Sequence, residues 1–93
     1  MKVHYYGRLD NLESSYTYQK FETEGLSLFL QNGPMFGYEP ATMIIKDPAM
    51  FIKKNDCYYR YVIEEFEVDI KEGVIKIDKN DLIGIIDNAL MFI

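Results

Sequence analysis

The sequence predicts an α+β fold, a mostly antiparallel sheet of four or five strands with two main helices packed on one face. Short runs rich in β-branched and aromatic residues recur along the chain and are separated by turn residues. Two other segments, about residues 23–32 and 80–92, space their apolar residues three and four apart, as one face of a helix does. The chain has 93 residues, 48% of them hydrophobic, which is enough for one core and predicts a single domain over residues 1–93.

The first part of the chain is expected to supply two strands and the first helix. Lys2–Gly7 and Tyr16–Phe21 are rich in β-forming side chains. Thr23 can cap the helix that follows, and Asn32-Gly33-Pro34 can end it, because Gly or Asn accepts a left-handed cap and Pro cannot continue a helix. The expected buried stripe of this helix consists of Leu26, Phe29 and Leu30.

The middle of the chain is expected to be a loop, a strand and a short helix, followed by a long extended segment. Met35–Pro40 is the loop and Ala41–Lys46 the strand, while Asp47-Pro48 resembles the start of a helix that runs through Lys53. Asp56–Ile70 predicts one long strand, or two strands joined by a bulge. Its apolar face switches near residues 63–65, where a bulge or a sharp twist would fit.

The last part predicts a hairpin and a terminal helix. Lys71-Glu72-Gly73 forms the turn onto a return strand at Val74–Asp78, and Asn80 or Asp78 caps the helix. Gly84, inside that helix, indicates close packing against the sheet. The expected apolar stripe consists of Leu82, Ile83, Ile86, Ala89, Leu90 and Ile93. The further apolar residues Ile85, Met91 and Phe92 favour either deep burial or a homodimer through this helix.

Charge and cysteine content limit the partners and the compartment. The net charge is −5, and division after Lys46 leaves −1 in the first half and −4 in the second. Such a charge disfavours direct contact with nucleic acid or anionic lipid and favours basic protein surfaces. A single cysteine, Cys57, excludes an intramolecular disulfide, and no signal-peptide or membrane-spanning stretch is recognised, so we expect a cytoplasmic protein, in the host cytoplasm if phage-encoded. No phosphate-loop, zinc or calcium motif is found, so neither a cofactor nor a metal is expected.

A row of carboxylates on the long extended segment is the first candidate for a partner-binding site. Glu65, Glu67 and Asp69 alternate along one strand face, about 6.6 Å apart at ~3.3 Å rise per residue. Glu64 and Glu72 lie close by in the sequence. This spacing resembles a row of backbone phosphates, so the row could occupy a groove that binds nucleic acid. The alternative is a half-buried strand that turns its polar face to water.

Tyrosine is the second candidate feature. The chain has eight tyrosines, and Tyr58, Tyr59 and Tyr61 lie nearest to the acidic row in the sequence. Exposed tyrosine gives a large contact area at low entropic cost and is enriched in protein interfaces. The alternative is that most of these rings pack in the core.

One pattern resembles an enzyme family. His4-Tyr5-Tyr6-Gly7 on the first strand, together with Glu65-Phe66-Glu67 on a late strand, is similar to the ADP-ribosyltransferase folds. The resemblance implies an NAD-binding enzyme in which His4 orients the ribose and Glu65 or Glu67 stabilises the oxocarbenium-like centre.

The sequence as a whole favours a protein-binding inhibitor over an enzyme, because it contains no set of catalytic residues beyond that pattern. Phage anti-CRISPR proteins and immunity proteins share this small, acidic, tyrosine-rich profile. The predicted partner is an enzyme with a basic surface, such as a nuclease or another protein that handles nucleic acid. The NAD-binding enzyme and a homo-oligomeric structural subunit are the alternatives.

Overall fold

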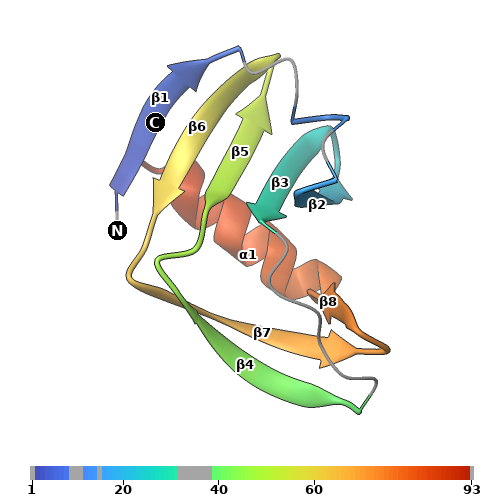
Figure 1. The fold of residues 1–93 in the computed structure, drawn as a ribbon. Helices are drawn as coiled ribbons and strands as arrows, with labels where there is room; N and C mark the ends of the chain where they lie inside the picture. Colours follow the sequence, from blue (N-terminus) through green and yellow to red (C-terminus); the bar gives the residue numbers. More distant parts are fainter. Residues whose placement is uncertain (1, 9–11, 15, 32–38, 93) are drawn as a thin grey trace.

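The computed structural model describes residues 2–8, 12–14, 16–31 and 39–92, which form two antiparallel sheets and one helix (Figure 1). The five-stranded sheet has the order β1-β6-β5-β3-β2, and the three-stranded sheet has the order β4-β7-β8. The elements are β1 (Lys2–Gly7), β2 (Tyr18–Thr23), β3 (Leu26–Gln31), β4 (Ala41–Lys46), β5 (Met50–Lys54), β6 (Cys57–Val62), β7 (Glu65–Lys71), β8 (Val74–Lys76) and α1 (Lys79–Leu90).

The predicted helix over residues 23–32 is wrong, because the described part of that segment belongs to the β2–β3 hairpin. Glu24 and Gly25 form the turn with positive φ angles of 45° and 79°, a backbone conformation that glycine adopts without strain. β3 is buried on both faces, so its apolar residues are nearly continuous and imitate a helical stripe. The proposed stop at Asn32-Gly33-Pro34 lies outside the described residues.

The short helix expected from Asp47 through Lys53 is also wrong, because β5 occupies most of that segment. β4 and β5 pair with β7 and β6 in one continuous register, in which Ala41 pairs with Ile70 and Met50 with Tyr61. The two strand pairs therefore form one long antiparallel ribbon that is bent between the sheets.

The bend lies where the sequence predicts a switch of the apolar face, near residues 63–65. It is a crossing between two sheets rather than a bulge within one strand. Asp47 has a φ of 45°, and its N–H donates to the carbonyl oxygen of Glu64 at 2.9 Å. This bond continues the hydrogen-bond pattern of the β4–β7 pair into the bend. The Nη1 atom of Arg60 donates to the carbonyl oxygens of Pro48 at 2.9 Å and Met50 at 3.1 Å, which ties the two arms together.

The C-terminal part follows the prediction more closely. Glu72 and Gly73 have positive φ angles at the β7–β8 turn. The Asp78 side chain caps α1 by accepting a hydrogen bond from the N–H of Asn80 at 2.7 Å. The helix ends at Leu90, two residues before the predicted end, and Met91 and Phe92 beyond it are exposed.

The main core lies between the two sheets and α1, which crosses one face of the five-stranded sheet (Figure 1). Its buried residues are Leu28, Leu30, Met50, Ile52, Tyr61, Val68, Ile70, Ile75, Leu82, Ile86 and Ala89. A smaller cluster on the outer face of the five-stranded sheet contains Leu12, Phe29 and Tyr58. The two helices expected on one sheet face are thus replaced by one helix and a second sheet.

Gly84 does not have the role expected of it. The residue is exposed, and a Cβ atom added there would meet no atom within 4 Å, so close packing against the sheet does not explain this glycine. The helix formed by the described residues is too short and too polar to cross a membrane.

Candidate functional site

The net charge of the protein is confined to its C-terminal third. Residues 64–93 contain eight acidic and three basic side chains, whereas residues 1–63 contain seven of each. The charge of −5 therefore belongs to the part of the chain that forms β7, β8 and α1; β7 and β8 lie in the three-stranded sheet, and α1 runs from β8 across the five-stranded sheet (Figure 1).

The acidic row predicted on β7 lies on its exposed face. Glu65, Glu67 and Asp69 are all exposed, while the residues between them are buried or half-buried. The Glu65 carboxylate forms an ion pair with the Lys46 ammonium at 2.6 Å, and the hydroxyl of Thr42 donates to Asp69 at 2.9 Å. Both contacts come from β4, which lies beside β7.

Three carboxylates of this surface have no described ion pair, one within the row and two beyond its ends. Glu67 has no polar partner among the residues that the structure describes, so its charge is fully available. Glu64 and Glu72 are exposed just beyond the two ends of β7.

The three tyrosines predicted to contact a partner differ in their exposure in the structure. Tyr58 and Tyr61 are each only 4% exposed, so their rings cannot form a contact surface in this conformation. Tyr59 is half-buried, and its ring centroid lies 5.5 Å from that of Tyr5. The sequence pattern could not separate the three because they follow one another on β6, which is covered on both faces.

The tyrosines that do lie at the surface belong to other segments. Tyr5 and Tyr6 lie on β1, and Tyr16 lies before β2, where it is 99% exposed. All three are on the side of the five-stranded sheet, and none lines the acidic cleft described next.

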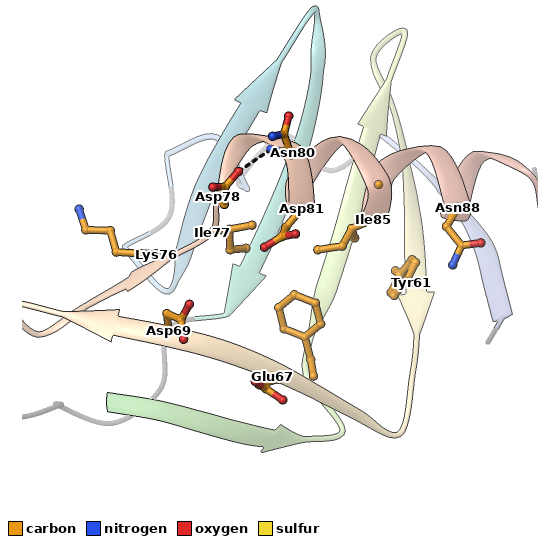
Figure 2. Close-up of a pocket in the computed structure, with 12 residues that line it drawn as sticks. Tyr61, Glu67, Asp69, Lys76, Ile77, Asp78, Asn80, Asp81, Ile85 and Asn88 are labelled. Carbon is orange, nitrogen blue, oxygen red and sulfur yellow. Dashed lines mark hydrogen bonds between the residues drawn. The ribbon is translucent and has the colours of Figure 1, made fainter. Parts of the chain in front are cut away.

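A cleft of about 480 Å³ lies between α1 and β7 (Figure 2). Figure 2 shows Asp81 extending from the helix toward β7 and Asp69 extending from the strand toward the helix, with Ile77 and Ile85 on either side of Asp81. Its lining residues are Tyr61, Phe66, Glu67, Asp69, Lys76, Ile77, Asp78, Asn80, Asp81, Gly84, Ile85 and Asn88. Four carboxylates and one ammonium group therefore surround an apolar floor.

The cleft exists because β8 covers only one end of β7. The β7–β8 pairing extends from Asp69 to Lys71, so the earlier residues of β7 have no described strand on that side. Backbone groups alternate in direction along an antiparallel ladder. Because Asp47 donates to Glu64, residues 65 and 67 direct their N–H and C=O groups away from β4 and toward the cleft.

Tyr61 closes one end of the cleft from β6. Its ring is almost fully buried, but its hydroxyl, which has no hydrogen-bond partner among the described residues, is not one of their buried unsatisfied atoms and so stays accessible to water. Burial alone raises the pKa of this hydroxyl, which therefore stays protonated and can both donate and accept. The Asp78 cap is predictable from the sequence, but this cleft is not, because it depends on how the two sheets and α1 meet in space.

A second polar cluster lies on the outer face of the five-stranded sheet. The Glu13 carboxylate accepts hydrogen bonds from Lys20 at 2.8 Å, from Lys53 at 2.7 Å and from the Tyr58 hydroxyl at 3.3 Å. The two ammonium groups lower the pKa of Glu13 to about 2, and Glu13 and Glu22 raise the pKa of Lys20 to about 12. This cluster holds residues 12–14 over Phe29 and Tyr58, so its role is structural.

The residues of the ADP-ribosyltransferase resemblance lie on different sheets. His4 lies on β1 and pairs with Arg60, while Glu65 and Glu67 lie on β7. His4 does not line the cleft that contains Glu67. Among the described residues, no group of three or more His, Cys, Asp or Glu side chains could hold a metal ion.

The comparisons with known proteins give no assignment. No protein-family model, curated protein or solved structure matches the chain. The geometry and the charge of the site are therefore the basis for a functional proposal.

Proposed function

We propose that this protein is a small inhibitor that acts in the cytoplasm and binds the basic surface of an enzyme that handles nucleic acid. In this proposal its contact surface is the acidic face, defined as the exposed carboxylates of β7 with the cleft between β7 and α1. The observation that carries the proposal is the confinement of the net charge to the part of the chain that forms β7, β8 and α1.

Charge segregation of this kind supports binding to a cationic surface. An acidic face attracts a basic groove over several ångströms and accelerates association, and its effect weakens as salt shortens the Debye length. The β7 row adds a regular arrangement, because alternate residues of a strand place their carboxylates along one line. A groove that accepts the phosphates of a nucleic acid can accept such a line by the same charge neutralisation.

The proposal is tested by capture from lysate of the source cells with three baits. One bait is the wild type. The row variant carries Glu65→Gln, Glu67→Gln and Asp69→Asn. The tip variant carries Glu22→Gln, Glu24→Gln and Asp56→Asn, which are exposed residues at the tips of the β2–β3 and β5–β6 hairpins, far from β7 (Figure 1).

Both variants remove three negative charges and conserve side-chain shape, so they differ only in the place of the change. We expect the wild type and the tip variant to retain a basic protein that short duplex DNA releases, and we expect the row variant to lose it. Equal retention by all three baits, or a partner that DNA does not displace, would reject the proposal.

A further inference from the structure

β4 forms an open edge of the three-stranded sheet. All six of its residues pair with β7 in a regular register, and no described strand lies on its other side (Figure 1). The strand is exposed along most of its length, and its apolar residues Met43 and Ile44 are 37% and 55% exposed. A regular, apolar and open strand edge is a template for pairing with another chain.

The other edges of the two sheets carry features that hinder such pairing. β1 is interrupted by a shift of register after Tyr5. β2 carries the ion pair between Lys20 and Glu22. β8 has only three residues, and the Gln19 side chain occupies the carbonyl oxygen of Ile75 at 2.8 Å. Folded proteins protect sheet edges by bulges, charges and short strands, so among the described strands β4 is the edge best suited to receive a partner strand.

The backbone of β4 determines how a second strand can pair with it. The N–H of Asp47 donates to Glu64, and backbone groups alternate in direction along an antiparallel ladder, so residues 41, 43 and 45 face β7. The N–H and C=O groups of Thr42, Ile44 and Lys46 therefore point to the open edge. A second, antiparallel copy of β4 satisfies all of them when Ile44 lies opposite Ile44 of that copy and Thr42 lies opposite its Lys46.

We propose that β4 pairs in this register with β4 of a second copy of this chain, about a two-fold axis at Ile44, which joins the two three-stranded sheets into one continuous sheet. The contact is isologous, because each copy supplies the same residues. The two Ile44 side chains pack on each other at the axis, and Met43 packs on Ile45 of the second copy. The pairing therefore covers the exposed apolar residues of the strand.

The charges along β4 favour a second copy of the same strand. Lys46 is its only charged residue and lies at its end, 2.6 Å from the Glu65 carboxylate of its own chain. In the proposed register Lys46 lies opposite Thr42 of the second copy, whose hydroxyl donates to Asp69 within each copy at 2.9 Å. Each Lys46 thus lies between acidic residues of the two chains. No like charges are directly opposite each other across this contact, although both copies are acidic as a whole.

The pairing goes beyond the function proposed above and also changes the shape of the acidic face. Thr42, Ile44 and Lys46 lie directly opposite the residues of the β7 row, so they share its face of the sheet. A two-fold axis perpendicular to the sheet keeps that face on the same side in both copies. The two acidic rows then lie about 14 Å apart, which is three strand spacings of ~4.8 Å.

The first test is sedimentation velocity over a concentration series with the wild type and two variants. Ile44→Lys places two ammonium groups face to face at the axis, and the exposure of Ile44 leaves the fold intact. Val74→Lys adds the same charge at a 42% exposed apolar residue of β8, at the other edge of the same sheet. We expect the wild type and Val74→Lys to dimerise equally and Ile44→Lys to dimerise at least about tenfold more weakly.

Amide hydrogen exchange of the wild type tests the contact without a substitution. The N–H groups of Thr42, Ile44 and Lys46 point to the open edge, so they should exchange slowly only at concentrations at which the dimer forms. The N–H groups of Met43 and Ile45 face β7 and should exchange slowly at every concentration. Alternate protection of this kind identifies a strand paired on both sides.

Single cysteines test the register, in a Cys57→Ser background that removes the native thiol. Ile44→Cys places two thiols at the axis, where the Cα atoms of a hydrogen-bonded pair lie about 5.5 Å apart, within reach of a disulfide. Thr42→Cys leaves the two thiols four positions apart along the strands, or more than about 13 Å. Mild oxidation should cross-link the first variant and not the second.

Three results would overturn the proposal. They are a wild type that stays monomeric at every concentration, a dimer that Ile44→Lys leaves intact, and equal weakening by Ile44→Lys and Val74→Lys. A monomeric wild type whose outward β4 amides become protected only with the captured partner would replace the second copy with a strand of that partner. None of these results depends on the row variant, so the function proposed above and the β4 pairing can fail separately.

Discussion

Glu13 shows how a single side chain holds a loop on this fold. Its carboxylate contacts two ammonium groups and a tyrosine hydroxyl from β2, β5 and β6, and so joins three strands of the five-stranded sheet. The ion pairs are roughly one-third exposed, so water and salt weaken them. The cluster nevertheless keeps Leu12 buried on Phe29 and Tyr58.

The Glu13 cluster predicts a specific pH dependence of stability. The pKa of Glu13 is about 2 in the folded protein, against an ordinary value of 4.5. A lowered pKa stabilises the fold above pH 4.5, and this contribution is lost as the pH falls toward 2. Urea unfolding of the wild type and of Glu13→Gln should therefore show a difference in unfolding free energy that is constant above pH 4.5 and shrinks below it. A difference that does not change with pH would contradict the cluster.

Gly84 gives a second prediction about a single residue. A Cβ atom at this position meets open space, so the helix loses stability to glycine without a compensating contact. We expect Gly84→Ala to stabilise the protein by about 0.5–1 kcal/mol, measured by urea unfolding. Destabilisation by the same change would mean that α1 packs more closely on the sheet than the structure shows.

At the level of elements, the β2–β3 hairpin separates the observed fold from the helix that the sequence pattern favours. Gly25 has a φ of 79° in the turn, where an alanine is strained. Gly25→Ala should therefore destabilise the protein by about 1–2 kcal/mol. If residues 23–32 formed a helix, the same substitution would stabilise it by about 1 kcal/mol. The sign of the change in unfolding free energy decides between the two structures.

The helix was predicted because periodicity cannot separate a short helix from a strand that is buried on both faces. Leu28 and Leu30 face the main core, while Phe29 is covered from the other side by Leu12 and Tyr58. Leu12 and Tyr58 are distant in sequence from β3, so no local sequence pattern indicates that they cover Phe29. A stronger local signal was the Glu24-Gly25 pair between two runs of β-forming residues, which is typical of a hairpin turn.

The same reasoning explains which other elements could be predicted. β1 and β4 are confirmed at both ends, and the Asp78 cap of α1 is confirmed by its hydrogen bond, because each depends on local residues. The short helix at Asp47 was wrong because Pro48 lies at the bend of a ribbon whose other arm is Cys57–Lys71. Pairing with that distant arm overrides the local preference of Asp-Pro for a helix start.

At the level of the whole molecule, the bent ribbon connects the fold to the proposed function. The bend carries β7 away from the five-stranded sheet and leaves its earlier half open toward α1, which creates the acidic cleft. The sequence could predict the exposed carboxylates, since alternation along a strand is local. It could not predict that Asp81 and Tyr61 share a cleft with Asp69, because that depends on how the second sheet meets the helix.

The central claim is that the acidic face, and not the total charge, binds the partner. Calorimetry with the captured and purified partner at about 150 mM salt tests this claim most directly. The row variant, with Glu65→Gln, Glu67→Gln and Asp69→Asn, should bind at least about tenfold more weakly than the wild type, while the charge-matched tip variant stays within about threefold. Equal weakening by the two variants would contradict the account, because the partner would then respond only to net charge.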